Sequence, residues 1–164
     1  MVPITVEALA RRADDVVVVT PRSATAHWMG REIVTDYDLV VQSVVRGDQQ
    51  PGGHVTLRAP GGIVDRVGQQ VPGVIRLEVG RPYLVFLSRA ENGAVGIHYL
   101  THLTASILPL SVAPDGSVTV VPAVEGLRVA TNPTGPTAVQ SDGTVMRREG
   151  IALDQLVRVL RGAP

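Results

Sequence analysis

The sequence predicts a mainly β domain, either an antiparallel barrel or a barrel-like sandwich, with one short helix at each end. Short apolar or alternating segments follow one another between residues 16 and 122, with no helical pattern among them. Turn-forming Gly, Pro, Asn and Asp separate these segments at close spacing, as in sandwiches and barrels. Helical periodicity occurs only over about 5–13 and 152–161.

Length and composition predict one soluble domain over residues 1–164 with an aliphatic core. Hydrophobic residues make up 45% of the chain but aromatic residues only 3%. Fifteen basic and 15 acidic residues cancel, so the charge predicts neither a nucleic acid nor an anionic membrane as partner. The absence of cysteine excludes a disulfide framework, a thiol nucleophile and a Cys-ligated metal. No apolar run approaches the roughly 20 residues that span a bilayer.

Both helices are predicted from apolar residues at i, i+3, i+4 and i+7. In the first helix Thr5 is a suitable N-cap and Glu7 suits the first turn. In the second, Asp154 comes early and Arg161 late, which complements the helix dipole. The two apolar stripes are Val6, Leu9, Ala10 and Ala13, and Leu153, Leu156, Val157 and Leu160.

The strands are predicted from valine runs and from period-two alternation. Residues 16–19 form a buried strand, 33–45 a long half-buried strand, and 83–87 a central strand that is apolar on both faces. Further strands are expected at 54–59 and 74–79, and hairpin turns at Asn92-Gly93 and Asp115-Gly116. The predicted core includes Val17, Val19, Ile33, Leu39, Val41, Leu57, Val85, Leu87, Leu153 and Leu156.

Two segments are predicted to be loops that serve as contact surfaces. Residues 61–73 are Gly-rich and are expected to form an irregular excursion. Residues 131–149 contain few large apolar side chains and many Pro, Gly, Thr and Ser, which is typical of a long surface loop. Recognition is often carried by loops on a rigid sheet, so both segments are candidates for binding.

His98 and His102 have a spacing that binds zinc when it falls on a helix. Their surroundings, however, predict an extended strand, on which four residues span about 13 Å, too far for one metal unless a turn intervenes. We therefore favour structural histidines over metal ligands. Both remain possible contact residues.

Asp36 and Asp38 are expected on the same strand face, about 7 Å apart. With Asp14, Asp15 or Glu32 nearby they could bind calcium or form an acid/base pair, although a solvated polar face explains them more simply. Two glycine pairs, Gly52-Gly53 and Gly61-Gly62, could form anion-binding nests, but they lack the Lys-Ser/Thr of a phosphate loop. Turns are the preferred interpretation of both pairs.

Trp28 is the only tryptophan in the chain and lies beside a predicted turn. An exposed Trp28 would mark a contact surface, whereas a buried one would cap the core. The buried alternative is preferred. No GxSxG elbow, HExxH motif or EF-hand loop occurs, so the sequence predicts no catalytic residue, no cofactor and no metal.

Four segments together resemble a recurring exported domain of myxobacteria and similar bacteria that has no assigned activity. These segments are Ala13–Val19, Arg31–Thr35, Val44–Gly47 and Val79–Leu87. Their order also resembles, more distantly, the netrin-like or tissue-inhibitor module, which implies an OB-like barrel. The inhibitor members of that family chelate zinc through an N-terminal cysteine. Because this chain has no cysteine, that mechanism does not carry over.

The resemblance implies an extracytoplasmic protein, secreted, periplasmic or on the cell surface, whose leader has been removed. The start of the chain, residues 1–5, itself lacks the charged and apolar regions of a signal peptide. We expect a non-catalytic binding or structural module whose partner is a protein or a surface. The alternative is a hydrolase or metal-dependent enzyme assembled from the scattered His and Asp residues.

Overall fold

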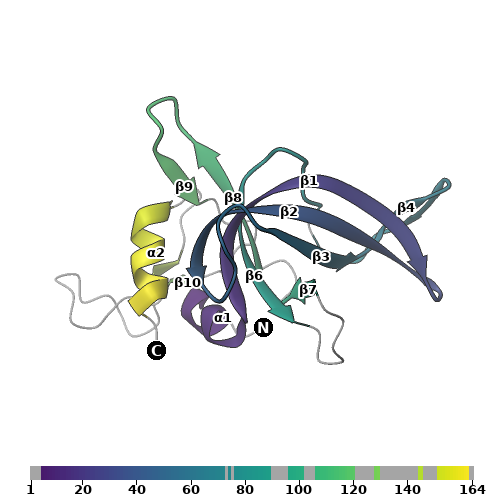
Figure 1. Ribbon diagram of the computed structural model, residues 1–164, viewed down its shortest axis with the longest axis horizontal. Coiled ribbons are helices and arrows are strands. Elements are labelled where there is room, and N and C mark those ends of the chain that lie inside the picture. The colour runs from purple at the N-terminus through teal and green to yellow at the C-terminus, as the bar shows by residue number, and fades with distance from the viewer. Residues whose placement is uncertain are drawn as a thin grey trace.

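The computed structural model describes residues 5–72, 74, 76–89, 96–101, 106–120, 128–129, 144–145 and 151–162. Strands dominate it, and one short helix lies at each end of the described chain (Figure 1). The predicted fold class is therefore confirmed. In chain order the elements are α1 (Val6–Arg12), β1 (Asp15–Met29), β2 (Glu32–Arg46), β3 (His54–Pro60), β4 (Gly62–Val64), β5 (Val67–Gln69), β6 (Tyr83–Arg89), β7 (Ile97–Leu100), β8 (Ile107–Val112), β9 (Val118–Val120), β10 (Arg128–Val129), β11 (Thr144–Val145), β12 (Ile151–Ala152) and α2 (Leu153–Gly162).

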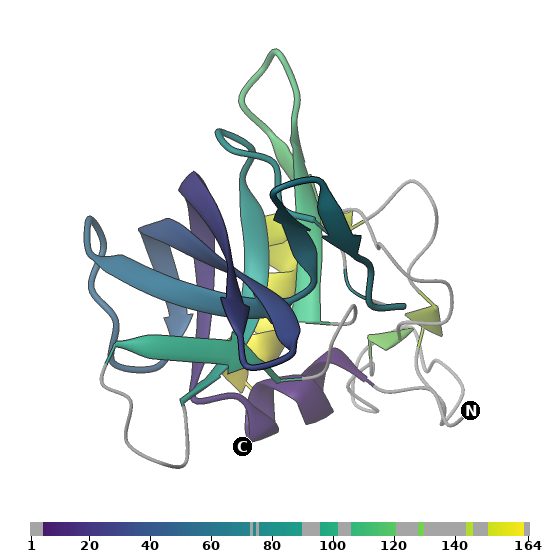
Figure 2. The same cartoon turned by 90° about the vertical axis from the view of Figure 1, so that its right-hand side faces the viewer.

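Five strands are joined by hydrogen bonds into a closed ring in the order β1-β2-β3-β7-β6, with β6 returning to β1. Neighbours in the ring are antiparallel except β3 and β7, which are parallel. The sheet continues from β6 through β8, β9 and β12. The β8–β9 hairpin projects from the ring, as Figure 2 shows at the top, and Gly116 adopts φ 88° in its predicted Asp115-Gly116 turn.

The first two strands are far longer than the part that closes the ring. β1 pairs with β6 only over residues 15–19, but it pairs with β2 as far as Met29 opposite Glu32. We call residues 20–40, the part of this hairpin beyond β6, the arm; β3 pairs along it over residues 34–40 of β2 (Figure 1). The run of residues 16–19 is a strand as predicted, but its continuation through Pro21 and small polar residues gave no sequence signal.

The valine run of β1 contributes to two cores, one on each of its faces. Val17 and Val19 face the inside of the ring, whereas Val16 and Val18 face the two helices. Since successive side chains of a strand point to opposite faces, both faces of β1 and β6 must be covered, and all four valines are buried. The inner core comprises Val17, Val19, Tyr37, Leu39, Val41, Val55, Leu57, Ala59, Leu77, Tyr83, Val85, Leu87 and Ile107.

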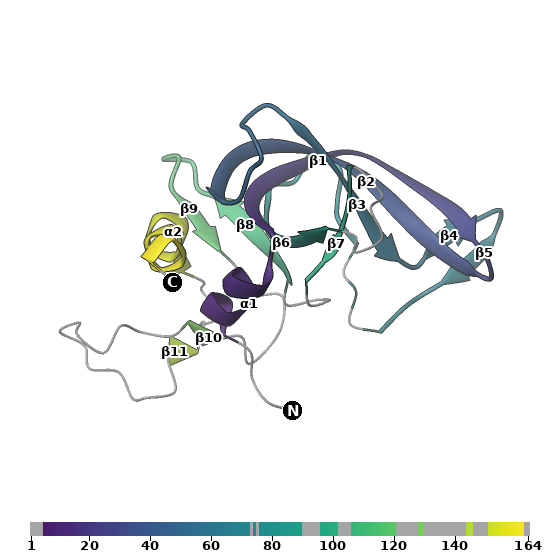
Figure 3. The ribbon, with the colours of Figure 1, turned by 60° about the horizontal axis from the view of Figure 1, so that its bottom comes forward.

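The two helices cover the outer core, on the side away from the arm (Figure 3). Thr5 caps α1 as predicted, since its hydroxyl accepts a hydrogen bond from the Ala8 backbone at 3.1 Å. Leu156 and Leu160 of α2 are fully buried, while Leu153, predicted for the core, is partly buried. None of the described helices is long and apolar enough to cross a membrane.

The prediction that residues 61–73 are irregular is wrong, because β4 and β5 form a small hairpin there. Its turn is made by Asp65 and Arg66, both at positive φ, 47° and 72°. Two-residue hairpin turns need this conformation, which Asp tolerates. Three-residue strands with two glycines among them carry too little alternation for the sequence to reveal them.

The strand predicted at 74–79 is also absent from the described residues of that segment, 74 and 76–79. Two buried tyrosine hydroxyls take the place of a neighbouring strand. The hydroxyl of Tyr37 accepts a hydrogen bond from the backbone of Leu77 at 3.4 Å, and that of Tyr83 accepts one from Glu78 at 2.9 Å. Leu77 thereby enters the inner core without belonging to a ladder.

Two predicted turns or loops fall largely outside the described residues. They are the Asn92-Gly93 turn and the loop at 131–149, of which only β11 is described, paired with β10. β6 and β7, which flank the former, are antiparallel neighbours.

Candidate functional site

Trp28 lies at the tip of the arm, immediately before the Gly30-Arg31 turn. It is 49% exposed, and its neighbour Met29 is 47% exposed. The preferred prediction of a buried Trp28 is therefore wrong. Because β1 and β2 continue past the last residue paired with β6, the tip projects beyond the ring (Figure 1).

His98 is buried, and its partner is a fully buried carboxylate, that of Asp15. The two side chains lie 3.2 Å apart, from Nε2 to Oδ2, and the backbone of Asp48 donates to Asp15 at 3.1 Å. The predicted extended conformation of His98 is confirmed, while His102 lies outside the described residues. Within the part of the chain that the structure describes, no three His, Asp or Glu side chains are placed to hold a metal ion.

Asp36 lies on the outer face of the arm, where it is held by two basic side chains. The Arg58 guanidinium donates to both carboxylate oxygens, at 2.8 and 2.9 Å, and His27 Nε2 lies 2.9 Å from one of them. Arg58, on the next strand, is directly opposite Asp36 in the register. This bidentate pair fixes the position of the carboxylate, so it explains Asp36 without a bound cation.

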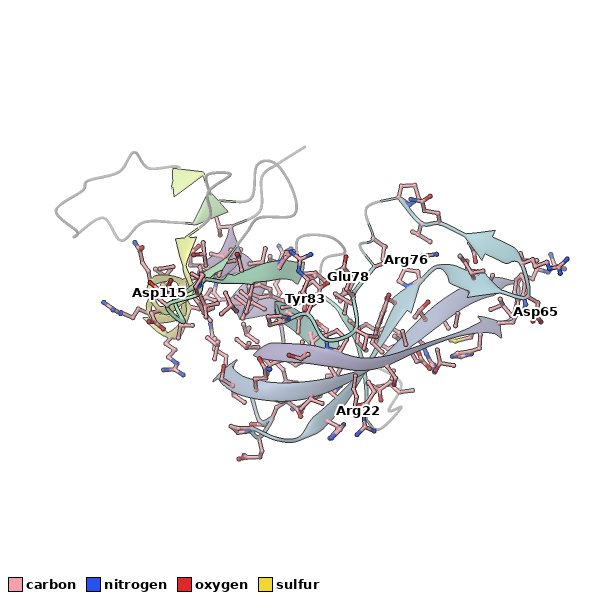
Figure 4. The ribbon with its side chains drawn as sticks, turned by 90° about the horizontal axis from the view of Figure 1, so that it is seen from above. Arg22, Asp65, Arg76, Glu78, Tyr83 and Asp115 are labelled. Carbon is pink, nitrogen blue, oxygen red and sulfur yellow. The ribbon has the colours of Figure 1, made fainter. Side chains whose placement is uncertain are left out.

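Asp38 lies two residues further along the same face and has its own basic partners. His54 Nδ1 is 2.9 Å from one carboxylate oxygen, and Arg22 Nε is 3.1 Å from the other. Figure 4, which labels Arg22, shows this face on the opposite side of the arm from the β4–β5 hairpin. The described histidines and aspartates that could serve catalysis thus form separate pairs, on the outer face of β1, β2 and β3 or, for His98, beneath the surface.

The pairing on the outer face changes the pKa values of its members. The hydrogen bonds from Arg58 lower the pKa of Asp36; partial burial opposes this effect, and His27 adds to it. In return, the hydrogen bond to Asp36 raises the pKa of Arg58, which stays charged at every pH at which the protein folds. A carboxylate so held is a poor proton acceptor, since a general base needs a pKa near the working pH.

Replacing Arg58 with methionine is expected to raise the pKa of Asp36, because the two donated hydrogen bonds are lost while the side chain keeps its length. A folded-state pKa below the unfolded value stabilises the folded chain above about pH 4, and this stabilisation disappears as the pH falls through the folded pKa. The difference in the free energy of unfolding between wild type and Arg58→Met should therefore be largest at neutral pH and should disappear in acid. Urea unfolding at a series of pH values measures it.

The matched control is Arg22→Met, whose guanidinium is paired with Asp38 instead and is 68% exposed. It should leave the titration of Asp36, followed by NMR, unchanged. An Arg58→Met variant with the same pH profile as wild type would show that the pair contributes nothing.

A cavity of about 600 Å³ lies on the inner face of the arm, at the end of the inner core. The β4–β5 hairpin and the segment that follows it close the cavity on the side away from β2 and β3. It is lined by Thr35, Tyr37, Ala59, Pro60, Gly61, Gly62, Ile63, Gly68, Gln69, Gln70, Val71, Val74 and Arg76. Neither Trp28 nor His98 lines it.

Two glycines allow the hairpin to lie this close to the arm. At Gly62, with φ 143°, a Cβ atom would lie 2.5 Å from Thr35 Oγ1 and 3.1 Å from Ala26 Cβ. Gly61, with φ 95°, donates its backbone N–H to Ile33 O at 2.8 Å, and its carbonyl accepts from Thr35 Oγ1 at 2.7 Å. The pair thus directs the chain from β3 into β4 and is neither a phosphate loop nor the simple turn that was predicted.

The described part of the cavity lining is rich in hydrogen-bond donors and contains no acidic side chain. Gln69 Oε1 accepts from the Ile33 backbone, which leaves the Gln69 amide nitrogen as a donor. Arg76 is the one charged side chain among the described lining residues, and Figure 4 shows it pointing from its segment toward the β4–β5 hairpin. The lining residues that the structure describes include no His, Asp, Glu, Cys or Ser, so they offer no nucleophile with an adjacent base.

The chain matches no family model, no curated protein and no solved structure. Its function is therefore proposed from the geometry of the cavity and the arm.

Proposed function

We propose that this protein is a non-catalytic binding module whose ligand site is the cavity between the arm and the β4–β5 hairpin. The observation that supports it is the cavity itself. Its volume of about 600 Å³ falls in the range of small-ligand sites, roughly 300–1,000 Å³. Its lining combines apolar side chains and glycine backbone with several polar groups that can orient a ligand.

The rim of the site adds exposed apolar surface. Trp28 and Met29 at the tip of the arm are about half exposed, and so are Ile63 and Val67 on the β4–β5 hairpin, at 55% and 49%. Other exposed large hydrophobic residues of the described chain, Val79 and Val112, lie elsewhere. Apolar side chains gathered on two neighbouring hairpins are typical of a contact surface, and tryptophan is enriched where binding energy concentrates.

We also propose that the ring is an OB-type barrel. It has five strands, as the OB fold does, and OB folds bind ligands at the face of strands 2 and 3 and at the loop between strands 1 and 2. Here the cavity is lined from β2 and β3, and the exposed Trp28 precedes the β1–β2 loop. An extracytoplasmic location remains a proposal that follows from the sequence resemblance.

The proposed site can be tested by screening a fragment library by thermal shift against both wild type and the variant Gly68→Leu. Gly68 lines the cavity, and a Cβ there would meet Ile63 Cγ1 at an ordinary 3.7 Å, so leucine fills the space without straining the backbone. Compounds that bind in the cavity should raise the Tm of wild type and not that of Gly68→Leu.

Gly68→Ala is the graded control, because one methyl group leaves most of the cavity open. Its response to the same compounds should stay close to that of wild type. Compounds that stabilise Gly68→Leu as strongly as wild type bind elsewhere, and a screen with only such compounds would contradict the proposed site.

A further inference from the structure

We propose that the cavity selects ligands carrying a carboxylate, which Arg76 binds while the apolar lining covers the rest of the molecule. The inference rests on the proposed function and names the chemical class of its ligand.

The guanidinium of Arg76 has no charged or hydrogen-bonding partner among the described residues. No described residue forms an ion pair or a hydrogen bond with its guanidinium, whereas such contacts are present on the side chains of Arg22, Arg58, Arg81, Arg89 and Arg161. The planar guanidinium presents a fork of N–H donors that matches the two oxygens of a carboxylate. Arg76 is therefore free to serve a ligand.

Two further donors line the same cavity. Tyr37 receives a hydrogen bond from Leu77, so its hydroxyl proton remains available, and burial raises the pKa of Tyr37, which keeps that proton in place. Both Tyr37 and Arg76 line the cavity, and the charge of Arg76 opposes the effect of burial on the Tyr37 pKa. The amide nitrogen of Gln69 is the third donor.

Among the described lining residues there is no acidic side chain to compete for these donors or to repel an anion. Besides these donors, Thr35 and Gln70 add polar side chains to the lining, and Ala59, Ile63, Val71 and Val74 supply apolar ones. Such a site fits an acid with an aliphatic body, whose tail displaces water from the apolar part while its head meets the donors.

Isothermal titration calorimetry of the full chain with octanoate and with uncharged octanamide tests the proposal. Wild type should bind octanoate the more tightly, and Arg76→Gln should weaken octanoate binding about ten- to a hundredfold while changing octanamide binding little. Arg158→Gln, which removes one exposed charge from α2, should leave both affinities unchanged. Equal binding of the two probes by wild type, or equal octanoate binding by wild type and Arg76→Gln, would overturn the proposal.

Comparing Gly68→Leu with wild type distinguishes failure of the carboxylate inference from failure of the proposed binding site. If octanoate and octanamide bind equally and Gly68→Leu loses both, the cavity is a binding site without carboxylate selectivity. If Gly68→Leu binds both as wild type does, the proposed site itself is wrong. If wild type binds neither probe, the carboxylate inference fails, and the fragment screen alone decides about the cavity.

A second pair of probes distinguishes the source of the carboxylate. The tripeptide Ala-Val-Leu with a free C-terminus, compared with its amidated form, presents the same group at the end of a polypeptide. Tighter binding of the free-acid peptide than of octanoate would identify a chain terminus as the ligand, whereas the reverse order would identify a small organic acid.

Discussion

Replacing Asp15 with alanine is expected to lower the free energy of unfolding by about 1–3 kcal/mol for each buried polar group that is left without a partner. Asp15 is fully buried, and its loss would leave His98 without its partner and the Asp48 backbone without its acceptor. Urea unfolding at neutral pH measures the change.

Asp115→Ala is the control, because Asp115 is an exposed turn residue whose carboxylate accepts hydrogen bonds from the backbone and hydroxyl of Ser117. It should destabilise much less than Asp15→Ala. Similar losses in the two variants would mean that Asp15 and His98 do not form the buried pair that joins β1 to β7.

Replacing Phe86 with alanine is expected to cost about 3–5 kcal/mol, the range for removing a large aromatic side chain from a core. Phe86 is the only phenylalanine of the chain, is fully buried, and lies in the outer core that the two helices cover. The variant should also lose helical circular dichroism before strand signal on heating, since α1 and α2 depend on this cluster. Thermal melts followed at two wavelengths measure both effects.

Val112→Ala provides the comparison, because Val112 is 59% exposed at the end of β8. Its effect should stay within about 0.5 kcal/mol. A Phe86→Ala variant as stable as Val112→Ala would show that the helices do not pack on a second core.

The regular elements could be predicted because their signals are local. Alternation along residues 33–45 and the valines at 16–19 were enough to identify strands, and nine of the ten predicted core residues are buried, with Leu153 partly buried. The sequence did not reveal that β1 continues to Met29, since pairing with β2 overrides the weak propensity of its small residues. The fold has two cores because the side chains on both faces of β1 and of β6 are buried, one face against the inside of the ring and the other against the helices.

The candidate site could not be predicted, because it depends on contacts between distant segments. Forty residues separate Tyr37 from Leu77, and 36 separate Ile33 from Gln69. The pairing of Asp36 with Arg58 likewise needs the β2–β3 register, although the sequence did place Asp36 and Asp38 on one face. The one local signal for the cavity is the Gly61-Gly62 pair. A pair of glycines in the sequence predicts a turn, but it does not predict that the backbone at Gly62 packs closely against Thr35 and Ala26 of the arm.

An amide NMR titration of the full chain tests the binding site most directly. With octanoate, and with the strongest compound from the fragment screen, the largest chemical-shift changes should fall on the cavity glycines Gly61, Gly62 and Gly68. Residues of the outer face such as His27 and His54 should shift little, because the arm separates them from the cavity. Shifts concentrated on the outer face, with the three glycines unmoved at saturating ligand, would contradict the proposed function.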